Sequence, residues 1–350
     1  MSGADEDDPP VEPVRFGVLG TGRMAGKLVA AMGRCDHVEA VAVGSRDKQR
    51  AVGFAALYGI PTARGGPEGY EEVVSDPRVE AVYIALPPHR HRAWCEEAAR
   101  LGKAVLCEKP LAPTAADAAA MADACRAAGV ALVDGTQWTR TPRADAFRKV
   151  LDGGELGEVG RVTAAFSFPA DGWGSTEHRL DPHRGGGVLL DLGWYCVHAA
   201  LWAFGDDPEK VTATITREPG VGGEPVDVAA SGLLTFPGGR TAGFDVSYRL
   251  AWRNWVEFAG PGGSLVCDDF TNPNRPVSAS GGGTDPARPV RHFRHASDGA
   301  ASREELPPFD QPAAFLARAA ATIRSGGDDA ALALALRTQD VLDELREAGT

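Results

Sequence analysis

The order of hydrophobic and polar residues divides the chain into two halves of different character. In the first half, short apolar runs are expected to be buried strands, at residues 15–19, 38–44, 81–86, 104–107 and 130–134. Between them lie stretches whose apolar residues recur at helical spacing, at residues 24–32, 47–58, 70–75, 91–101 and 114–128. Strands that alternate with helices in this way predict βαβ units, and therefore a doubly wound parallel sheet.

The second half follows a different pattern. After a predicted helix at residues 142–151, residues 159–168 alternate between apolar and polar, as in a strand with one buried face. Short turns such as Pro237-Gly238-Gly239 separate further predicted strands, at residues 211–217, 226–236, 240–248, 255–259 and 264–267. Such strands form an antiparallel sheet. Residues 272–303 are rich in Pro, Gly and Ser and are expected to be a long loop. Two helices, at residues 311–325 and 329–347, close the chain.

The predicted fold is therefore α/β, with two domains in 350 residues. Residues 1–13 are expected to be a disordered acidic tail. Residues 14–137 are expected to form a Rossmann domain with a doubly wound parallel sheet. Residues 138–350 are expected to form an α+β domain for substrate binding and oligomerisation, with an open, mostly antiparallel sheet. The last helices of this second domain could pack back on the first.

Composition narrows the range of partners. A net charge of −12, from 36 Lys and Arg against 48 Asp and Glu, argues against nucleic acid and against an anionic membrane surface. No apolar run without charges reaches about 18 residues, so we expect no membrane span. The N-terminus also lacks the apolar segment of a signal peptide. Six cysteines without a C-x-x-C pair favour a reducing compartment, and we expect a cytoplasmic protein.

The first candidate site is a glycine turn that follows the first predicted strand. Residues 20–25 read G-x-G-x-x-A and lead directly into a predicted helix. The first Gly permits a tight turn, the second lets a pyrophosphate approach the backbone, and a small third residue lets helix and strand pack closely. The helix N-terminus offers N–H groups to the phosphates. The order of strand, turn and helix predicts a dinucleotide site that includes Gly20, Gly22, Arg23, Met24 and Ala25.

The end of the second strand indicates which dinucleotide binds. NAD-specific sites usually carry an acid there, which binds the ribose 2′-hydroxyl. This strand ends instead at Gly44-Ser45-Arg46, and the next residue, Asp47, is better placed as the cap of the following helix. Ser45 and Arg46 could bind a 2′-phosphate, so NADP is the expected cofactor, with NAD possible. The alternative is that Arg46 is a solvated loop residue.

The second candidate site is Glu108-Lys109-Pro110, directly after the fourth strand. Ligands of such sheets bind at the carboxyl ends of the strands, so Lys109 is expected to point toward the nicotinamide. The following proline restricts Lys109 to an extended backbone. A solvated surface lysine is the alternative.

The third candidate site is an apolar helix that follows three glycines at residues 185–187 and ends before Gly205. Polar side chains on such a helix are costly unless they are paired or used in function. A core helix whose polar groups form structural hydrogen bonds is the alternative. Helical spacing places four side chains on one stripe: Asp191, Tyr195, His198 and Trp202. The histidines of the chain show no metal-ligand spacing, and no metal site is expected.

Together these motifs resemble the glucose–fructose oxidoreductase / inositol dehydrogenase (Gfo/Idh/MocA) family over nearly the whole chain. A Pro-Pro-His-Arg-His segment at residues 87–91 adds to the similarity. The resemblance implies that Lys109 contacts nicotinamide and substrate and that Asp191 is the acid of the site. Other members carry a catalytic histidine where this chain has Tyr195. The chain is therefore similar to the tyrosine branch, which includes dihydrodiol and xylose dehydrogenases and nucleotide-sugar 3-ketoreductases.

The resemblance also implies a wider set of contacts and a homodimer or homotetramer. The implied cofactor contacts are Leu86, Pro87, His91, Glu108 and Lys109. Candidate substrate contacts are Gln137 and Trp138 at the crossover between domains, Arg179 in the loop before the glycines, and His198. For Arg179 a surface-loop role is equally open.

The expected reaction is hydride exchange between NADP and a carbinol or ketone of a sugar, nucleotide sugar or similar polyhydroxylated molecule. In it Tyr195 passes the proton, and Lys109 holds the hydroxyl and favours the phenolate. Asp191 orients Lys109 or binds a substrate hydroxyl. Two alternatives remain: an NAD-dependent glycoside hydrolase of the same family, and a dinucleotide-binding sensor without catalysis.

Overall fold

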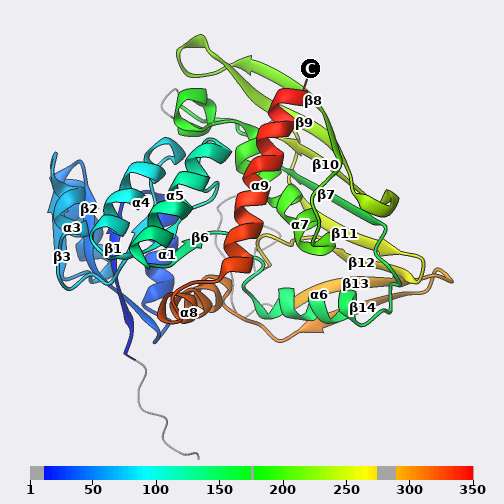
Figure 1. Ribbon diagram of the computed structural model, residues 1–350, viewed down its shortest axis with the longest axis horizontal. Coiled ribbons are helices and arrows are strands. Elements are labelled where there is room, and N and C mark those ends of the chain that lie inside the picture. The colour runs from blue at the N-terminus through cyan, green and yellow to red at the C-terminus, as the bar shows by residue number, and fades with distance from the viewer. Residues whose placement is uncertain (1–11, 175–176, 274–288, 350) are drawn as a thin grey trace, which may run out of the picture.

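A computed structural model describes residues 12–174, 177–273 and 289–349, arranged around two β-sheets (Figure 1). The disordered tail expected at residues 1–13 lies, up to residue 11, outside the described residues. The two sheets are joined by helices, and the chain ends on a long helix, α9 (Asp329–Ala348), that runs between them.

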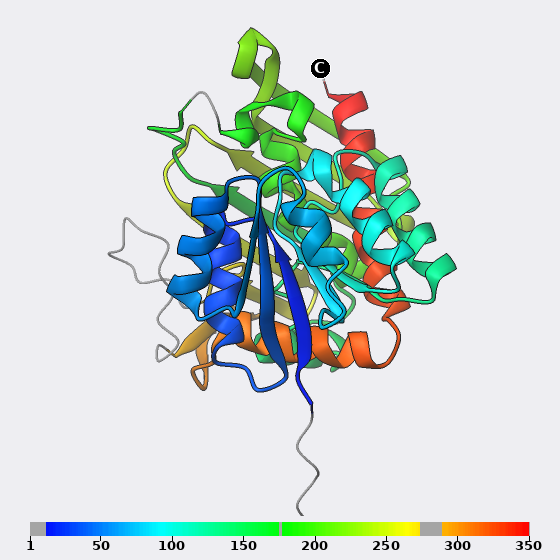
Figure 2. The ribbon, with the colours of Figure 1, turned by 90° about the vertical axis from the view of Figure 1, so that its left-hand side faces the viewer.

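The first sheet is parallel throughout, with the order β3-β2-β1-β4-β5-β6. The sequence prediction of a doubly wound sheet is confirmed, and helices flank both faces (Figure 2). The strands are β1 (Val14–Leu19), β2 (Val38–Ser45), β3 (Thr62–Gly65), β4 (Ala81–Ile84), β5 (Ala104–Cys107) and β6 (Leu132–Asp134). The helices are α1 (Arg23–Met32), α2 (Lys48–Tyr58), α3 (Gly69–Val74), α4 (His91–Arg100) and α5 (Ala115–Ala128).

The edge strand β3 was not predicted from the sequence. It pairs with β2 alone, and its four residues are exposed or half-buried. A strand at the edge of a sheet needs no continuous apolar run. The pattern of hydrophobic residues therefore carried no sign of it.

The second sheet has eight strands in the order β14-β13-β12-β11-β7-β10-β9-β8 and is antiparallel except where β10 pairs with β7. Helices α6 (Pro142–Asp152), α7 (Trp194–Phe204) and α9 lie on one of its faces (Figure 1). No described helix covers the other face. The strands are β7 (Arg161–Ser167), β8 (Lys210–Pro219), β9 (Pro225–Thr235), β10 (Thr241–Ser247), β11 (Arg253–Gly260), β12 (Gly263–Cys267), β13 (Val290–Ala296) and β14 (Ala301–Leu306).

The prediction of a long loop at residues 272–303 was wrong for its described C-terminal part. Residues 274–288 lie outside the described residues, but β13 and the start of β14 fall within the rest and extend the sheet as a hairpin. In β13 the two buried residues, Val290 and His292, lie on either side of Arg291, and charged or polar residues among the strand's positions hid the period of two. The edge strand β14 is mostly charged or polar and leaves no apolar pattern.

The C-terminal helices tie the two sheets together. Phe315 and Leu316 of α8 (Gln311–Arg324) are fully buried in the same core cluster as Val18 of β1 and Leu28 of α1. Helix α9 packs on α5 beside the first sheet and on α7 and β8 beside the second. The two C-terminal helices therefore link the two sheets through packed side chains.

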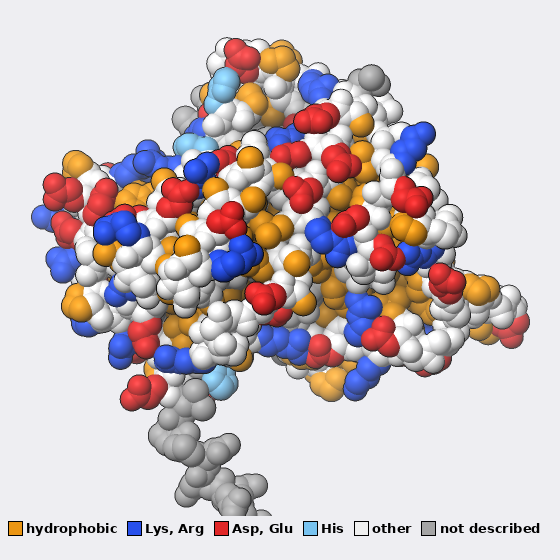
Figure 3. Space-filling view, viewed as in Figure 1, with side chains coloured by type: hydrophobic (Ala, Val, Ile, Leu, Met, Phe, Trp, Pro, Cys, Tyr) orange, Lys and Arg blue, Asp and Glu red, His pale blue; other side chains and the backbone are white. Residues whose placement is uncertain are grey.

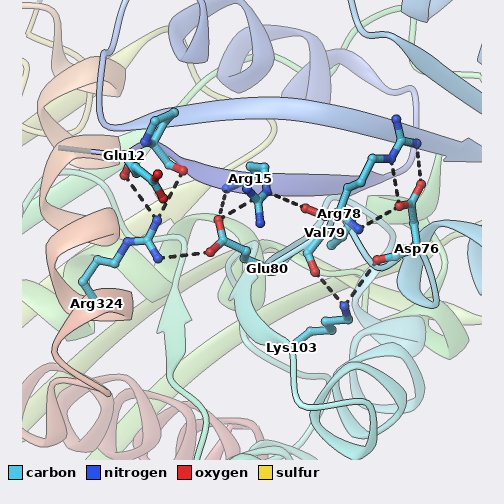
Figure 4. A network of polar contacts seen from close by, with 9 residues as sticks. Glu12, Arg15, Asp76, Arg78, Val79, Glu80, Lys103 and Arg324 are labelled. Atoms are coloured by element: carbon cyan, nitrogen blue, oxygen red, sulfur yellow. Dashed lines mark hydrogen bonds and ion pairs between the residues drawn. The ribbon is translucent and has the colours of Figure 1, made fainter. Parts of the chain in front are cut away.

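Polar contacts at the amino-terminal edge of the first sheet fasten α8 to it (Figure 4). Arg324 donates from Nη1 to Glu80 Oε1 at 3.1 Å. Its Nη2 donates to the backbone oxygens of Glu12 and Pro13 at 3.2 and 3.3 Å. Glu80 Oε2 in turn accepts the backbone N–H of Arg15 at 3.0 Å. These contacts lie at the edge opposite the carboxyl ends of the strands and leave that end open.

One helical stretch, Pro182–Phe204, is long and apolar enough to cross a membrane, but 78% of its apolar window is buried inside the structure. It contains α7, which packs on β7, β10 and β11. Burial in the protein core therefore accounts for its apolar composition.

Candidate active site

A cavity of about 1780 Å³ lies between the carboxyl ends of the first sheet and the helix-covered side of the second. Single small-molecule sites usually occupy about 300–1,000 Å³, so this cleft has room for a dinucleotide and a second molecule. We call the part lined by residues between positions 20 and 50 the cofactor half. The part lined by Lys109 and by residues between positions 137 and 272 is the substrate half.

The glycine turn forms the floor of the cofactor half. Gly20 has φ of +110°, and a Cβ there would lie 2.5 Å from the backbone oxygen of Ala85, so only glycine fits. Gly22 caps α1 without a side-chain hydrogen bond, and nothing lies within 4 Å of the place of its Cβ. The first N–H groups of α1 therefore face the open cleft, as anion binding requires. Ala25 is fully buried and packs in the core instead of lining the cleft.

Basic side chains gather around this turn. Arg46 follows β2 and lines the cleft beside Ser45, while Asp47 caps α2 by accepting the N–H of Arg50 at 2.9 Å. The cap expected for Asp47 is confirmed, so its carboxylate is already bound to the helix. The basic residues that line this half are Arg23, Lys27, Arg34, Arg46 and Arg50.

Three of these basic residues were missed from the sequence: Lys27, Arg34 and Arg50. Arg23, Lys27 and Arg34 are spaced at i, i+4 and i+11 along α1 and its end, so they share one face. This spacing was available as a signal. Arg34 also forms an ion pair with Asp310 at 2.6 Å.

The substrate half brings together Lys109, Asp191 and Tyr195. Lys109 follows β5, its bond to Pro110 is cis, and its side chain is 12% exposed. Its Nζ donates to Asp191 Oδ1 and to the Asp191 backbone oxygen, both at 2.8 Å. The same Nζ lies 4.6 Å from the ring centre of Tyr195. The three residues come from segments about 80 positions apart and form one cluster.

Asp191 is the centre of this cluster. Besides Lys109, its Oδ2 accepts the Tyr248 hydroxyl at 3.1 Å and forms an ion pair with Arg179 Nε at 3.1 Å. Burial alone would raise the pKa of Asp191, but the charges of Lys109 and Arg179 and these hydrogen bonds hold the pKa well below its ordinary range. Asp191 therefore stays ionised and fixes the position of Lys109.

The protonation states of the other two members follow from the same balance. Burial works against the charge of Lys109, but the neighbouring Asp191 carboxylate raises its pKa above the usual value of 10.5. Burial also raises the pKa of Tyr195 above its usual 10.0, and the Lys109 ammonium offsets only part of this effect. As expected, the charge of Lys109 lowers the pKa of Tyr195, but burial outweighs this effect. At neutral pH Tyr195 is a phenol beside a charged lysine.

The turn that carries Asp191 is itself held from the second sheet. Asp191 lies in a π-helical turn, Leu189–Gly193, and Asp227 on β9 accepts the Leu189 N–H at 2.7 Å. Gly187 has φ of +116°, and a Cβ there would lie 2.2 Å from Asp227 Oδ1. Sequence reasoning missed both Asp227 and Tyr248, which reach the site only because β9 and β10 pair in this register.

A wall of aromatic rings lines the rest of the substrate half. Phe166 lies 5.6 Å from both Tyr195 and Trp252, measured between ring centres. Phe168 continues the row, 6.1 Å from Trp252 and 5.8 Å from Trp173. We call Phe166, Phe168, Trp173 and Trp252 the aromatic wall; all four line the cleft.

Besides Ala25, two further predicted contacts, His91 and His198, do not line the cleft. His91 is fully buried between backbone oxygens, 2.7 Å from that of Leu86 and 3.1 Å from that of Leu111, and so supports the loops after β4 and β5. His198 is 1% exposed and packs edge-on against Trp138, with ring centres 5.8 Å apart. Burial lowers the pKa of His198 to about 3. Its proposed contact with substrate is not supported, because His198 is buried against Trp138 and does not line the cleft.

The remaining predicted contacts do line the cleft: Arg23, Met24, Leu86, Pro87, Glu108, Gln137, Trp138 and Arg179. Glu108 is 7% exposed and accepts the Tyr83 hydroxyl at 2.6 Å, and burial raises its pKa. Within the described residues, no group of three His, Cys, Asp or Glu side chains could hold a metal ion.

Two family models match successive parts of this chain. Residues 14–136 match the model of an oxidoreductase family with an NAD-binding Rossmann fold, and residues 145–266 match the model of a GFO/IDH/MocA C-terminal domain. A D-xylose 1-dehydrogenase (NADP(+)) of Haloferax volcanii is 32% identical over 338 residues, which cover 95% of this chain and 98% of that protein. A trans-1,2-dihydrobenzene-1,2-diol dehydrogenase of Oryctolagus cuniculus is 37% identical over 252 residues, covering 70% and 73%.

Among solved structures, KijD10, a 3-ketoreductase from Actinomadura kijaniata in complex with NADP and TDP-benzene, superposes with a TM-score of 0.85. It is 29% identical, and the match covers 96% of this chain and 98% of that one.

Proposed function

The chain belongs to the GFO/IDH/MocA family of oxidoreductases, and on this premise we propose that it exchanges a hydride between NADP and a carbinol or ketone of a polyhydroxylated small molecule. The observation that carries the proposal is the cluster of Lys109, Asp191 and Tyr195. It joins a charged lysine to a protonated phenol beside the cofactor half of the cleft.

Each member of the cluster has its own role. In the reducing direction Tyr195 donates its proton to the substrate oxygen as the carbonyl becomes a hydroxyl, and in oxidation it receives that proton. The Lys109 ammonium donates a hydrogen bond to the same oxygen and stabilises negative charge on it. Asp191 is a positioning residue, since it holds Lys109 and is itself held by Tyr248. The bound nicotinamide supplies or accepts the hydride.

NADP fits the residues of the cofactor half. The uncapped N–H groups of α1 suit a pyrophosphate, and Gly22 leaves room for it. Arg46 and Ser45 at the end of β2 suit the 2′-phosphate, and Asp47, the acid that could have bound a 2′-hydroxyl, is used as a helix cap. The relatives named for NADP and the NADP-bound 3-ketoreductase support this choice.

Turnover measured with both cofactors tests the proposal. The enzyme is incubated with NADP or NAD and a panel of sugars, polyols, dihydrodiols and nucleotide sugars, and the absorbance of reduced nicotinamide is followed. We expect oxidation of at least one panel member with NADP and slower oxidation with NAD. Release of sugar from an aryl glycoside without net reduction would show a glycoside hydrolase instead. Tight cofactor binding with no turnover of any panel member would indicate a sensor.

We also propose that the chain forms a homodimer or homotetramer through the face of the second sheet that no described helix covers (Figure 1). Leu233 on β9 is 41% exposed. Light scattering gives the mass in solution, and a monomer would contradict the assembly.

The surface and the cysteines bear on other partners and on location. The face seen in Figure 3 mixes acidic and basic side chains and shows no basic patch for nucleic acid. All six cysteines are buried and free, which suits a reducing, cytoplasmic location.

A further inference from the structure

The charges of the substrate half are paired with one another. Arg179 contacts Glu177 Oε1 through Nη1 at 3.1 Å and Asp191 through Nε at 3.1 Å. His178 Nδ1 lies 2.9 Å from Glu177 Oε1, and its hydrogen bond lowers the pKa of Glu177 to about 2. Lys109 is paired with Asp191. Among the described residues of this half, the basic side chains are Lys109, His178 and Arg179, and each already has a carboxylate partner.

A nucleotide-linked substrate would bring a negatively charged diphosphate into this half. Phosphates are usually bound by arginine forks or by a helix N-terminus with uncapped N–H groups. Arg179 is held by two carboxylates and also lies over the Trp173 ring, at 5.4 Å. Moving it onto a phosphate would leave Asp191, whose side chain is 14% exposed, with one cationic partner fewer. The described charges of this half therefore oppose an anionic substrate.

The aromatic wall indicates what the substrate half accepts instead. Trp252 is 41% exposed although it belongs to a row of packed rings, and it faces the cleft at the rim. An exposed indole in a cleft is a binding surface for an apolar face of a ligand. A sugar or cyclohexane ring presents C–H groups on its faces and hydroxyls at its edge. The row leads from Trp252 through Phe166 to Tyr195, so a ring lying on it would place its edge at the proton donor.

We propose that the substrate is an uncharged polyhydroxylated ring, or the corresponding ketone, whose apolar face stacks on the aromatic wall, and not a nucleotide-linked sugar. This inference rests on the proposed function and names the substrate class of the same site. It separates the chain from the 3-ketoreductase that it resembles, whose structure contains TDP-benzene. An uncharged apolar substituent on the ring, such as a phenyl group, would extend over Trp252 and strengthen binding.

Binding to the enzyme saturated with NADP tests the substrate class without any turnover. Calorimetry compares methyl glucoside, phenyl glucoside and dTDP-glucose at two ionic strengths. We expect phenyl glucoside to bind about two- to tenfold more tightly than methyl glucoside, since an aromatic pair adds about 0.5–1.5 kcal/mol. Added salt should leave this binding unchanged, because no charge is involved. Tighter binding of dTDP-glucose, weakened by salt, would overturn the proposal.

A matched pair of variants locates the effect. Trp252→Ala should remove the roughly two- to tenfold advantage of the phenyl group and lower kcat/KM for neutral substrates by a similar factor. Leu250→Ala is the control, because Leu250 is 45% exposed on the same loop but does not line the cleft. Equal losses in both variants would contradict a role for the wall. If binding follows the prediction but no substrate is turned over with either cofactor, the proposed function fails while the binding preference stands.

Discussion

The two halves of the cleft are built in opposite ways. The cofactor half draws five basic residues and its glycine turn from positions 20–50, between the end of β1 and the first turn of α2. The catalytic cluster of the substrate half and its supports, Lys109, Asp191, Tyr195, Asp227 and Tyr248, come from four separate segments. In the cofactor half, the basic side chains line an open groove around the uncapped N–H groups of α1. In the substrate half, the Lys109 ammonium and the Asp191 carboxylate are paired with each other inside the protein.

The two halves should therefore respond differently to substitution, because the cofactor half attracts its ligand through the summed charge of several residues, whereas the substrate half depends on the relative positions of a few side chains. A dinucleotide phosphate gains from several nearby cations, so the loss of one removes part of the attraction. A proton donor works only where its neighbours hold it, so the loss of one member disables the site. Substitutions in the substrate half should therefore affect turnover strongly and cofactor binding weakly. The reverse should hold in the cofactor half.

Lys109→Met should have the largest effect. It removes the ammonium that we propose contacts substrate, and it leaves the buried Asp191 carboxylate with Arg179 and Tyr248 alone. We expect kcat/KM to fall by roughly 10⁴ or more, since a preorganised charge and its effect on the proton donor are both lost. Lys103→Met is the control, because Lys103 donates to backbone oxygens at the far edge of the first sheet (Figure 4). A folded Lys109→Met enzyme with near-normal turnover would remove Lys109 from the catalytic machinery.

Tyr195→Phe should come next. It keeps the ring against Phe166 and removes the hydroxyl alone. General acid–base catalysis is worth about 10² to 10⁴ in rate, so kcat should fall by that factor while the Kd of NADP stays constant. A variant that retains half of the wild-type kcat would return Tyr195 to a structural role.

The pH dependence of the wild-type enzyme checks the same residue. The pKa of Tyr195 is raised above 10, so the proton needed for reduction is present throughout the neutral range and is lost only at strongly alkaline pH. Reduction should be independent of pH from about 6 to 9 as far as this group is concerned, and oxidation, which needs the deprotonated form, should rise with pH. Reduction that speeds up with rising pH, or oxidation that slows down, would contradict the assignment.

The sequence predicted the cofactor half better than the substrate half, for a physical reason. The glycine turn, Ser45 and Arg46 are neighbours in sequence, so their geometry follows from local rules. Asp191 and Tyr195 were singled out by helical spacing, and a family resemblance gave them their roles. Their partners Asp227 and Tyr248 depend on strand pairing that no local pattern encodes.

The errors have the same origin. A π-helical turn at Leu189–Gly193 interrupts the helix on which a single polar stripe was assumed. His198 thus lies behind Trp138 and not beside Asp191. The edge strands β3 and β14 carry few buried residues, and a hydrophobic pattern cannot reveal a strand that is held mainly by backbone hydrogen bonds.

Gly187→Ala tests the support of the catalytic turn and should have an intermediate effect. The backbone there has φ of +116°, and the added methyl group would meet Asp227, which holds the Leu189 N–H. We expect a loss of about 3 kcal/mol of stability from strain and the disturbed hydrogen bond. Thermal unfolding measures it, with Gly22→Ala as the matched control, because nothing lies within 4 Å of that Cβ. Equal stability of Gly187→Ala and wild type would show that the turn tolerates a side chain.

Arg46→Ala should have the smallest effect and reports on the cofactor half. Arg46 lines the cleft at the end of β2 among four other basic residues, so its removal takes away one attractive contact and leaves the turn intact. A hydrogen bond to a charged group contributes about 1.5–3 kcal/mol, so the Kd of NADP should rise roughly tenfold to a hundredfold. The Kd of NAD, which lacks the 2′-phosphate, should change little, and kcat at saturating NADP should be preserved. Fluorescence titration of both cofactors with wild type and variant provides the four constants. Equal losses for NADP and NAD, or tighter NAD binding by the wild type, would show that this end of the cleft does not select the 2′-phosphate.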